Sequence, residues 1–294
     1  LEANANGSVR RFDCEGITLS LFLGNELEGG LANVYLRRHG STMEWTPLLG
    51  PSSPTRFQAH ADSGRLTGRG SWQGIEYSLA LVLAQGARAW FWHVQLLNTT
   101  STDQQLDLTY AQDLALAPYG AVRLNEFYVS QYVDHMPLTH TTRGVMVASR
   151  QNQAADGGNP WSLIGSLREG VSYCTDAMQF HGFAARAGHA PPGLVGTLPG
   201  RRLQHEHSMG VVRDKPIRLA PNERASAGFF GTYAANHPGA TSSADLERAN
   251  EALALAEAKP PAIDSAPANS ARDNAVTLFS SAPLLEVRDL DDGA

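Results

Sequence analysis

One short stretch of the sequence combines several side chains that can bind a polyhydroxylated ligand. Its candidate binding residues are Tyr128, Gln131, Tyr132, Asp134 and His135. Together they supply hydroxyl, amide, carboxylate and imidazole groups, and such a mixture is costly to bury without partners. We therefore expect this stretch to line a cleft and to contact a ligand.

A second candidate is the histidine pair His205 and His207, which follows a loop rich in glycine and proline. On a strand, residues two apart share a face, so both imidazoles can reach the same ligand or the same metal. No third metal ligand stands at an obvious spacing. We favour solvated or hydrogen-bonded imidazoles and predict no metal site, with binding to sugar hydroxyls as an intermediate interpretation.

Other chemically suggestive residues have simpler explanations. Glu26 and Asp113 fit turn or backbone contacts better than acid–base roles, because the sequence cannot place two carboxylates across a cleft. Trp90 and Trp92 share one strand face and Phe91 takes the other, and we predict that they form core. The phosphate-loop, nucleophile-elbow and zinc-protease motifs are absent from the sequence. We therefore predict no catalytic residue in this chain.

The elements that must position these residues are mostly strands. Period-two alternation and branched or aromatic residues mark them. We expect strands at 17–23, 31–36, 64–72, 74–83, 89–97, 105–116, 141–149 and 225–234. Residues 125–134 suit either a short helix or a strand, and 187–202 hold too many glycines and prolines for a regular element. Strands joined by short turns predict an all-β fold, a large antiparallel β-sandwich.

One segment near the end of the chain is strongly helical. Residues 245–258 are dominated by Ala, Leu and Glu, Ser242 or Ser243 can cap them, and Pro260 and Pro261 stop the helix. Residues 262–275 are rich in Ala, Pro, Ser and Asn and resemble a linker. We therefore divide the chain into a β-sandwich domain at 1–240 and a helical linker and stub at 241–294.

Composition excludes several classes of protein. The 294 residues include Lys+Arg 23 and Asp+Glu 29, for a net charge of -6, which argues against nucleic-acid binding. No apolar run approaches the roughly 20 residues that span a bilayer, and no signal segment opens the chain, so we expect no membrane association. Cys14 and Cys174 suit free thiols in a reduced compartment, and we expect a cytoplasmic protein.

Several stretches resemble the N-terminal β-sandwich of the inverting glycoside phosphorylases of glycoside hydrolase family 94, formerly glycosyltransferase family 36. Residues 25–37 resemble the opening of that domain, and residues 97–100 with 108–117 resemble two of its successive strands. Residues 125–135 are most similar to the branch of 1,2-β-oligoglucan phosphorylases and cyclic β-1,2-glucan synthases.

The resemblance implies a galactose-mutarotase-like supersandwich, followed by a helical linker and a catalytic (α/α)6 barrel that this chain lacks. In the family, phosphate cleaves β-linked gluco-oligosaccharides to glucose 1-phosphate, with the general acid and the phosphate site in the barrel. We therefore expect no catalysis by this chain alone and no cofactor, with inorganic phosphate as a co-substrate of the parent enzyme. The implied roles are support of the barrel, homodimerisation, and lending residues 128–135 to the rim of the active site.

Two other functions stay open at this point. A free-standing carbohydrate-binding module would share the sandwich and the aromatic pairs but would bind glycans without a partner domain. A complete mutarotase- or lyase-like enzyme would use His205, His207 and a carboxylate as acid and base. The linker at 262–275 and the apolar stub at 278–285 favour the phosphorylase domain, because a self-contained module needs no such stub.

Overall fold

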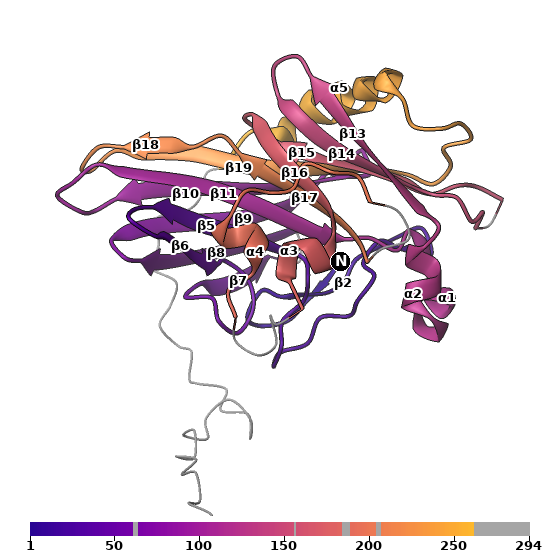
Figure 1. Ribbon diagram of the computed structural model, residues 1–294, viewed down its shortest axis with the longest axis horizontal. Coiled ribbons are helices and arrows are strands. Elements are labelled where there is room, and N and C mark those ends of the chain that lie inside the picture. Colours follow the sequence, from indigo (N-terminus) through magenta and orange to yellow (C-terminus); the bar gives the residue numbers. More distant parts are fainter. Residues whose placement is uncertain (61–63, 156, 184–188, 204–206, 262–294) are drawn as a thin grey trace, which may run out of the picture. The chain divides into compact units, whose positions relative to one another are not determined.

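The computed structural model describes residues 1–60, 64–155, 157–183, 189–203 and 207–261. The chain divides into two compact units, residues 1–263 and 264–294, and the second lies outside the described residues. Within the first unit, strands predominate and a few short helices lie on the faces and the edge of a long sheet (Figure 1). No helix of the described part is long and apolar enough to cross a membrane.

Fourteen strands of the described part form the main sheet. In spatial order they are β6 (Met43–Pro47), β5 (Asn33–His39), β11 (Gln104–Asp113), β17 (Ser208–Asp214), β16 (Gly170–Asp176), β14 (Gly144–Gln151), β15 (Trp161–Ser166), β19 (Arg224–Ala234), β10 (Ala89–Asn98), β9 (Ile75–Leu83), β8 (Arg65–Trp72) and β7 (Arg56–His60). Two more strands pair off this path: β13 (Val133–His140) with β14, and β18 (Ile217–Leu219) with β11. The described pairings are antiparallel, apart from a single parallel contact between β14 and β16 at Gly144 and Gly170.

Smaller elements complete the first unit. β1 (Glu2–Ala3) pairs with β2 (Val9–Arg11), and a three-stranded sheet contains β12 (Ala117–Pro118), β4 (Ile17–Thr18) and β3 (Asp13–Cys14). The α-helices are α1 (Tyr119–Leu124), α2 (Glu126–Ser130), α3 (Ala177–His181), α4 (Pro192–Val195) and α5 (Leu246–Leu253). All of these helices are short, so packing against the sheet rather than helix propensity must stabilise them.

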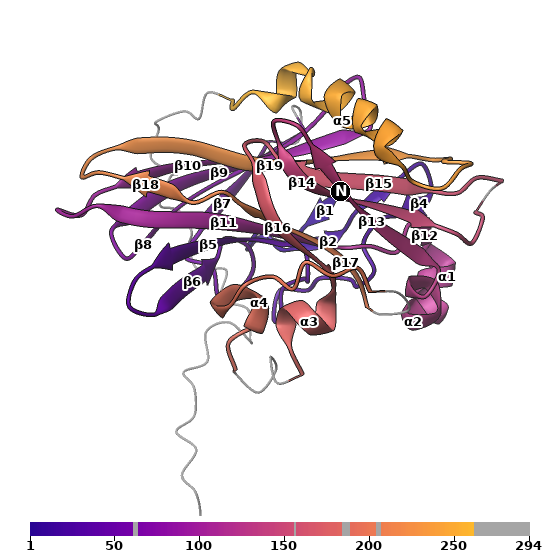
Figure 2. The same ribbon diagram turned by 45° about the horizontal axis from the view of Figure 1, so that its top comes forward.

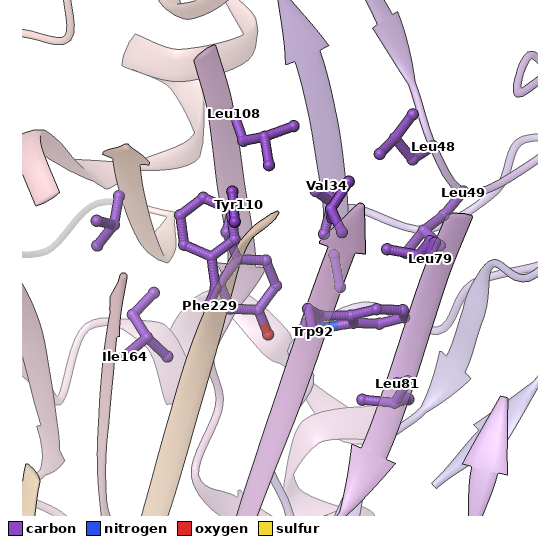
Figure 3. Packing of buried hydrophobic residues seen from close by; sticks show 14 of the residues in the cluster. Val34, Leu48, Leu49, Leu79, Leu81, Trp92, Leu108, Tyr110, Ile164 and Phe229 are labelled. Atoms are coloured by element: carbon purple, nitrogen blue, oxygen red, sulfur yellow. The ribbon is translucent and has the colours of Figure 1, made fainter. Parts of the chain in front are cut away.

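The main sheet curls so that its two halves face each other across one apolar core. In Figure 3, Val34 of β5 and Tyr110 of β11 lie opposite Leu79 of β9 and Trp92 of β10. Phe229 of β19 belongs to the same buried cluster. Burial of each such side chain contributes about 1.5–3 kcal/mol, so this core is the main source of stability.

Helices cover two regions of the outer face of the curled sheet. Ala249 and Ala252 of α5 pack with Phe91 of β10 and Phe230 of β19. On the other half of the sheet, α3 and α4 pack on strands β5, β11 and β17. Figure 2 shows α5 lying over one face and α3 and α4 on the opposite side. Strands buried on both faces lose simple polar–apolar alternation, as β10 shows.

Trp90 depends on a glycine in the neighbouring strand. Trp90 pairs with Gly231, and a Cβ atom at Gly231 would lie 2.0 Å from Cζ2 of the indole. The indole N–H donates to the Tyr110 hydroxyl at 3.0 Å, and that hydroxyl donates to Oε1 of Gln112 at 2.8 Å. The neighbouring strand β19 thus gives this buried tryptophan its space, and β11, from the other half of the sheet, gives it its hydrogen-bond partner.

The structure confirms the all-β supersandwich expectation and places Trp90, Trp92 and Phe91 in core, with Phe91 on the opposite face. The strand expected at 17–23 is wrong beyond Thr18, because the following backbone bonds to the Asp113 carboxylate instead of to a strand. Residues 187–202 do contain a regular element, the single-turn helix α4, which Pro192 begins. Residues 125–134 form helix α2 and then enter β13.

The C-terminal helix is confirmed, although it is shorter than expected. Ser242 is the cap: its hydroxyl accepts from the Ala244 N–H at 3.3 Å, while the Asp245 carboxylate accepts from the Ser242 N–H at 2.8 Å. The helix ends at Leu253, and a 3₁₀ turn at Ala256–Ala258 follows. The domain division at residue 240 stays a prediction.

A buried carboxylate joins three strands of the half-sheet under α3 and α4. Oδ1 of Asp107 on β11 lies 3.3 Å from Nε of Arg37 on β5 and 4.0 Å from Nε of Arg213 on β17. Its Oδ2 atom lies 2.6 Å from Nε2 of His39. Burial lowers the pKa of both guanidiniums, and in Arg213 the neighbouring Arg37 charge adds to this effect. Asp107 therefore separates two cations that would otherwise repel each other in a medium of low dielectric constant.

We predict that Asp107→Asn lowers the free energy of unfolding by about 3–5 kcal/mol, because it leaves two buried guanidiniums without their counter-charge. Urea denaturation measures the loss. Asp103→Asn is the matched control, since Asp103 pairs with Arg218 at 2.8 Å on the exposed surface and should cost at most about 1 kcal/mol. Equal effects of the two substitutions would contradict this account of Asp107.

Candidate functional site

The candidate stretch begins on helix α2, which is fixed at both ends. Oδ1 of Asn125 accepts from the Tyr128 N–H at 3.0 Å and caps the helix. At the other end, Nε2 of Gln151 donates to the carbonyls of Val129 and Ala115, at 3.2 and 2.9 Å. Val129 is buried in a small apolar cluster with Val122 of α1. The helix is therefore anchored beside β14, at one edge of the molecule (Figure 1).

Tyr128 and Tyr132 form a pair on the exposed side of this helix. Their ring centroids lie 5.0 Å apart, and the Tyr132 hydroxyl donates to the Tyr128 hydroxyl at 3.1 Å. This hydrogen bond raises the pKa of Tyr132. Tyr128 is 47% exposed and Tyr132 is 37% exposed, so the pair offers an aromatic surface with two hydroxyls.

Asp134, the second residue of strand β13, faces an arginine from the glycine- and proline-rich loop. Oδ1 of Asp134 lies 3.8 Å from Nη1 of Arg202, and the same Nη1 lies 3.7 Å from Sδ of Met136. Both charged side chains are only partly exposed. A carboxylate and a guanidinium side by side provide the acceptor and the donors that bind sugar hydroxyls.

His207 approaches the same region from the other side. Its ring lies edge-on to Phe127 of α2, with 4.8 Å between the ring centroids. Its backbone N–H donates to Oδ1 of Asp176 at 3.2 Å, and that buried carboxylate also caps α3 through Met178 and Gln179. The structure therefore brings His207 next to the stretch from Tyr128 to His135, which the sequence did not predict.

His135 lies behind this surface rather than on it, because it is only 2% exposed. Its Nδ1 atom lies 2.8 Å from the Ser149 hydroxyl, and its buried Nε2 atom has no hydrogen-bond partner in the part of the chain that the structure describes. Burial, with a smaller contribution from Arg202, lowers the pKa of His135 to about 4. At neutral pH this side chain is an uncharged member of the layer that supports β13.

Three further residues singled out in the sequence are Gln131, His205 and Asp113. Gln131 caps the end of α2 and is exposed, whereas His205 lies outside the described residues. Arg202 was missed by the sequence analysis, although it stands only a few residues before the histidine pair. Asp113 makes the backbone contacts expected of it, since its Oδ2 atom accepts from the N–H groups of Leu21 and Phe22 at 2.7 Å each.

Chemically, this surface suits binding. Among the described residues, no three His, Cys, Asp or Glu side chains gather closely enough to hold a metal ion. What gathers instead is an aromatic pair, a charge pair and an imidazole, the groups that stack on sugar rings and hydrogen-bond their hydroxyls. We call this surface, formed by Phe127, Tyr128, Tyr132, Asp134, Arg202 and His207, the α2 face.

Residues 2–231 match the family described as the SOGP N-terminal domain. The chain belongs to this family. A curated relative, the 1,2-beta-oligoglucan phosphorylase of Listeria innocua serovar 6a, is 31% identical over 238 residues. That alignment covers 80% of this chain and 20% of the relative, so this SOGP N-terminal domain spans about a fifth of the relative's length.

Solved structures add a likeness of fold. A polysaccharide lyase matches 80% of the SOGP N-terminal domain chain and 32% of its own, at 9% identity and a TM-score of 0.51. A protein from the human microbiome named as a kojibiose phosphorylase matches 85% of this chain and 32% of its own, at 9% identity and a TM-score of 0.42. At such identities the first likeness shows the fold alone.

The buried His135 of the SOGP N-terminal domain makes stability depend on pH. Its folded pKa of about 4 lies below its ordinary value of 6.5. Between these pH values the unfolded chain binds a proton that the folded chain excludes, so this contribution to stability is complete above pH 6.5 and falls as the pH drops toward 4. We predict a slope of up to about 1.4 kcal/mol per pH unit from this group.

Substitution His135→Gln should remove that slope while keeping a side chain that can bond to Ser149. Urea denaturation of both proteins at intervals between pH 4 and 7 measures the difference. Other titrating groups, such as the buried Asp113 whose pKa burial raises to about 6, are common to both proteins and cancel. Identical pH profiles would show that His135 is not held neutral in the folded protein.

Proposed function

We propose that this chain is a non-catalytic domain of a glycoside phosphorylase that releases glucose 1-phosphate from β-1,2-linked gluco-oligosaccharides. The observation that carries the proposal is membership of the SOGP N-terminal domain family over residues 2–231, together with a curated relative that is a 1,2-beta-oligoglucan phosphorylase. The relative is about five times longer than the matched region, which leaves ample chain for a separate catalytic domain.

In this proposal the α2 face rims the active site of the catalytic domain. Three features support it: the tyrosine pair is exposed, the charge pair of Asp134 and Arg202 is partly exposed, and β13 and α2 are firmly anchored. A rim must present hydroxyl-binding groups without moving, because positional errors of about 1 Å are costly in recognition. His135 and Asp176 then serve as supports behind the rim.

The same edge of the molecule also supports contact with another domain. Leu124 is 88% exposed and Phe127 is 50% exposed, close together on α1 and α2. Exposed apolar side chains in a group mark interaction surfaces more often than scattered ones do. We propose that the catalytic domain packs along α1, with the α2 face at the margin of that contact. A role in homodimerisation stays a prediction.

A direct test separates this proposal from the two alternatives. The chain is incubated with β-1,2-linked gluco-oligosaccharides and phosphate, and glucose 1-phosphate is assayed alongside the full-length enzyme. We expect release by the full-length enzyme only. Release by the chain alone would place a catalytic site inside it, as the mutarotase-like alternative requires. Tight glycan binding by the chain, without activity in the full-length protein, would favour the free-standing binding module.

In the full-length enzyme, we predict that Tyr132→Phe raises KM for the oligosaccharide about two- to tenfold, with kcat changed little. The substitution removes one hydroxyl that binds Tyr128 and faces the rim, and a single hydrogen bond is worth about 0.5–1.5 kcal/mol. Steady-state phosphorolysis kinetics measure the change.

Tyr77→Phe is the matched control, because it also removes one tyrosine hydroxyl, which lies 2.9 Å from the Thr55 hydroxyl. Tyr77 stands on β9, four strands away from β14, beside which α2 is anchored. Its KM should stay at the wild-type value. If both substitutions leave KM unchanged, or both change it equally, the α2 face does not rim the active site.

A further inference from the structure

A hollow of about 540 Å³ is lined by residues that do not belong to the α2 face. Its walls come from three stretches: residues 22–35, residues 45–52, and the ends of the α3–α4 region at His181 and Pro191. The volume falls within the range of about 300–1,000 Å³ that is usual for small-molecule sites. Nothing in the proposed role of the α2 face uses this hollow.

An aromatic wall forms one side of the hollow. Trp45 of β6 and Tyr35 of β5 both line it, and their ring centroids lie 6.1 Å apart in an edge-on arrangement. Trp45 is only partly buried and packs on the apolar cluster under α3 and α4. A half-buried tryptophan at the edge of a hollow offers a flat apolar surface of the size of a sugar ring.

The polar groups of this wall have unused hydrogen-bonding capacity. Neither the Trp45 indole N–H nor the Tyr35 hydroxyl makes a hydrogen bond within the described part of the chain. The ring nitrogens of His181 likewise have no hydrogen-bond partner among the described residues, and burial lowers the pKa of His181 to about 4. The Nε2 atom of His181 is buried without a hydrogen-bond partner among the described residues, which is uncommon for a buried polar atom. The Trp45 indole N–H and the Tyr35 hydroxyl instead reach the surface, where the hydroxyls of a ligand can replace water.

The opposite wall is a rigid turn that brings bare backbone to the hollow. Asn25 and Gly29 exchange backbone hydrogen bonds at 2.8 and 2.9 Å, and Oδ1 of Asn25 accepts from the N–H groups of Leu27 and Glu28. Gly29 has φ 80°, and a Cβ atom there would come within 3.2 Å of Pro51. The positive φ explains why glycine stands at this position of the turn.

We propose that this hollow binds a disaccharide-sized segment of a gluco-oligosaccharide, with one pyranose ring stacked on Trp45 and hydroxyls bonded to Tyr35 and His181. A pyranose ring has an apolar face and a rim of hydroxyls, which matches an aromatic wall bearing one donor, one hydroxyl and one neutral imidazole. The choice of β-1,2-linked glucose as the probe rests on the proposed function. The shape of the hollow and the chemistry of its lining residues are independent of that proposal.

The test titrates a β-1,2-linked glucose trisaccharide into the purified chain and follows the indole N–H resonances by NMR. The sequence has 5 tryptophans, so the spectrum is simple, and Trp45→Phe assigns the relevant peak. We expect the Trp45 resonance to shift saturably at sugar concentrations below about 10 mM, while that of the fully buried Trp90 stays unchanged.

Calorimetry on variants gives a second readout. Trp45→Ala should weaken binding at least about tenfold, and Tyr35→Phe about three- to tenfold, because the first loses the stacking surface and the second a single hydroxyl. Two matched controls lie outside the hollow. Trp72→Ala removes another partly buried tryptophan, and Tyr233→Phe removes a tyrosine hydroxyl that also has no hydrogen-bond partner among the residues described. Both controls should bind as the wild type does.

The outcomes separate this proposal from the proposed function. Shifts confined to residues of the α2 face, with Trp45 unaffected, would overturn the hollow as a glycan site and leave the rim in place. Absence of saturable binding by the chain would also overturn the hollow as a glycan site. The proposed function would be unaffected by that result, because the phosphorolysis assay of the full-length enzyme tests it separately. A saturable Trp45 shift, lost affinity in Trp45→Ala and intact affinity in Trp72→Ala would establish the hollow as a binding site.

Discussion

The half of the main sheet that lies under α3 and α4 depends on one buried carboxylate. Asp107 holds the guanidiniums of Arg37 and Arg213 at the centre of strands β5, β11 and β17. Arg213 in turn donates to the carbonyl oxygens of Gly193 and Gly196, which form helix α4 and the turn after it. One negative charge therefore fixes both the spacing of three strands and the position of the segment beside the hollow. Buried charges of this kind are expensive, and they persist where their geometry positions something else.

A second buried chain of hydrogen bonds crosses the core. It runs from the Trp90 indole through Tyr110 and Gln112 to Asp113, whose carboxylate holds the backbone of Leu21 and Phe22. Phe22 then lines the hollow. Burial raises the pKa of Asp113 to about 6 despite its two backbone donors. The buried site therefore disfavours the charged form of this carboxyl group. The interior strands and the wall of the hollow are thus coupled by hydrogen bonds as well as by apolar packing.

The sequence predicts the strands best where a segment has its own turn signals at both ends. Strands β9, β10 and β19 lie close to the expected positions, and the capping box at Ser242 marks the C-terminal helix. Sequence reasoning fails at residues 19–23, whose alternation is that of a strand. The N–H groups of Leu21 and Phe22 donate there to the side chain of Asp113, 92 and 91 residues away. It also fails at His135, because only the pairing of β13 with β14 sets Ser149 opposite this ring and buries it.

The two candidate surfaces differ in how much of each a sequence can reveal. Most of the α2 face is contiguous, so its polar and aromatic density is visible in residues 127–134, and only Arg202 and His207 had to be supplied by folding. The hollow takes Trp45, Tyr35 and His181 from three separate stretches, none unusual by itself, and it exists only because α3 packs on β5. Unused hydrogen-bonding groups are likewise invisible in a sequence, since each becomes informative only after every neighbour has been placed. A search for ligand sites in this fold must therefore begin from unpaired groups in the structure rather than from motifs.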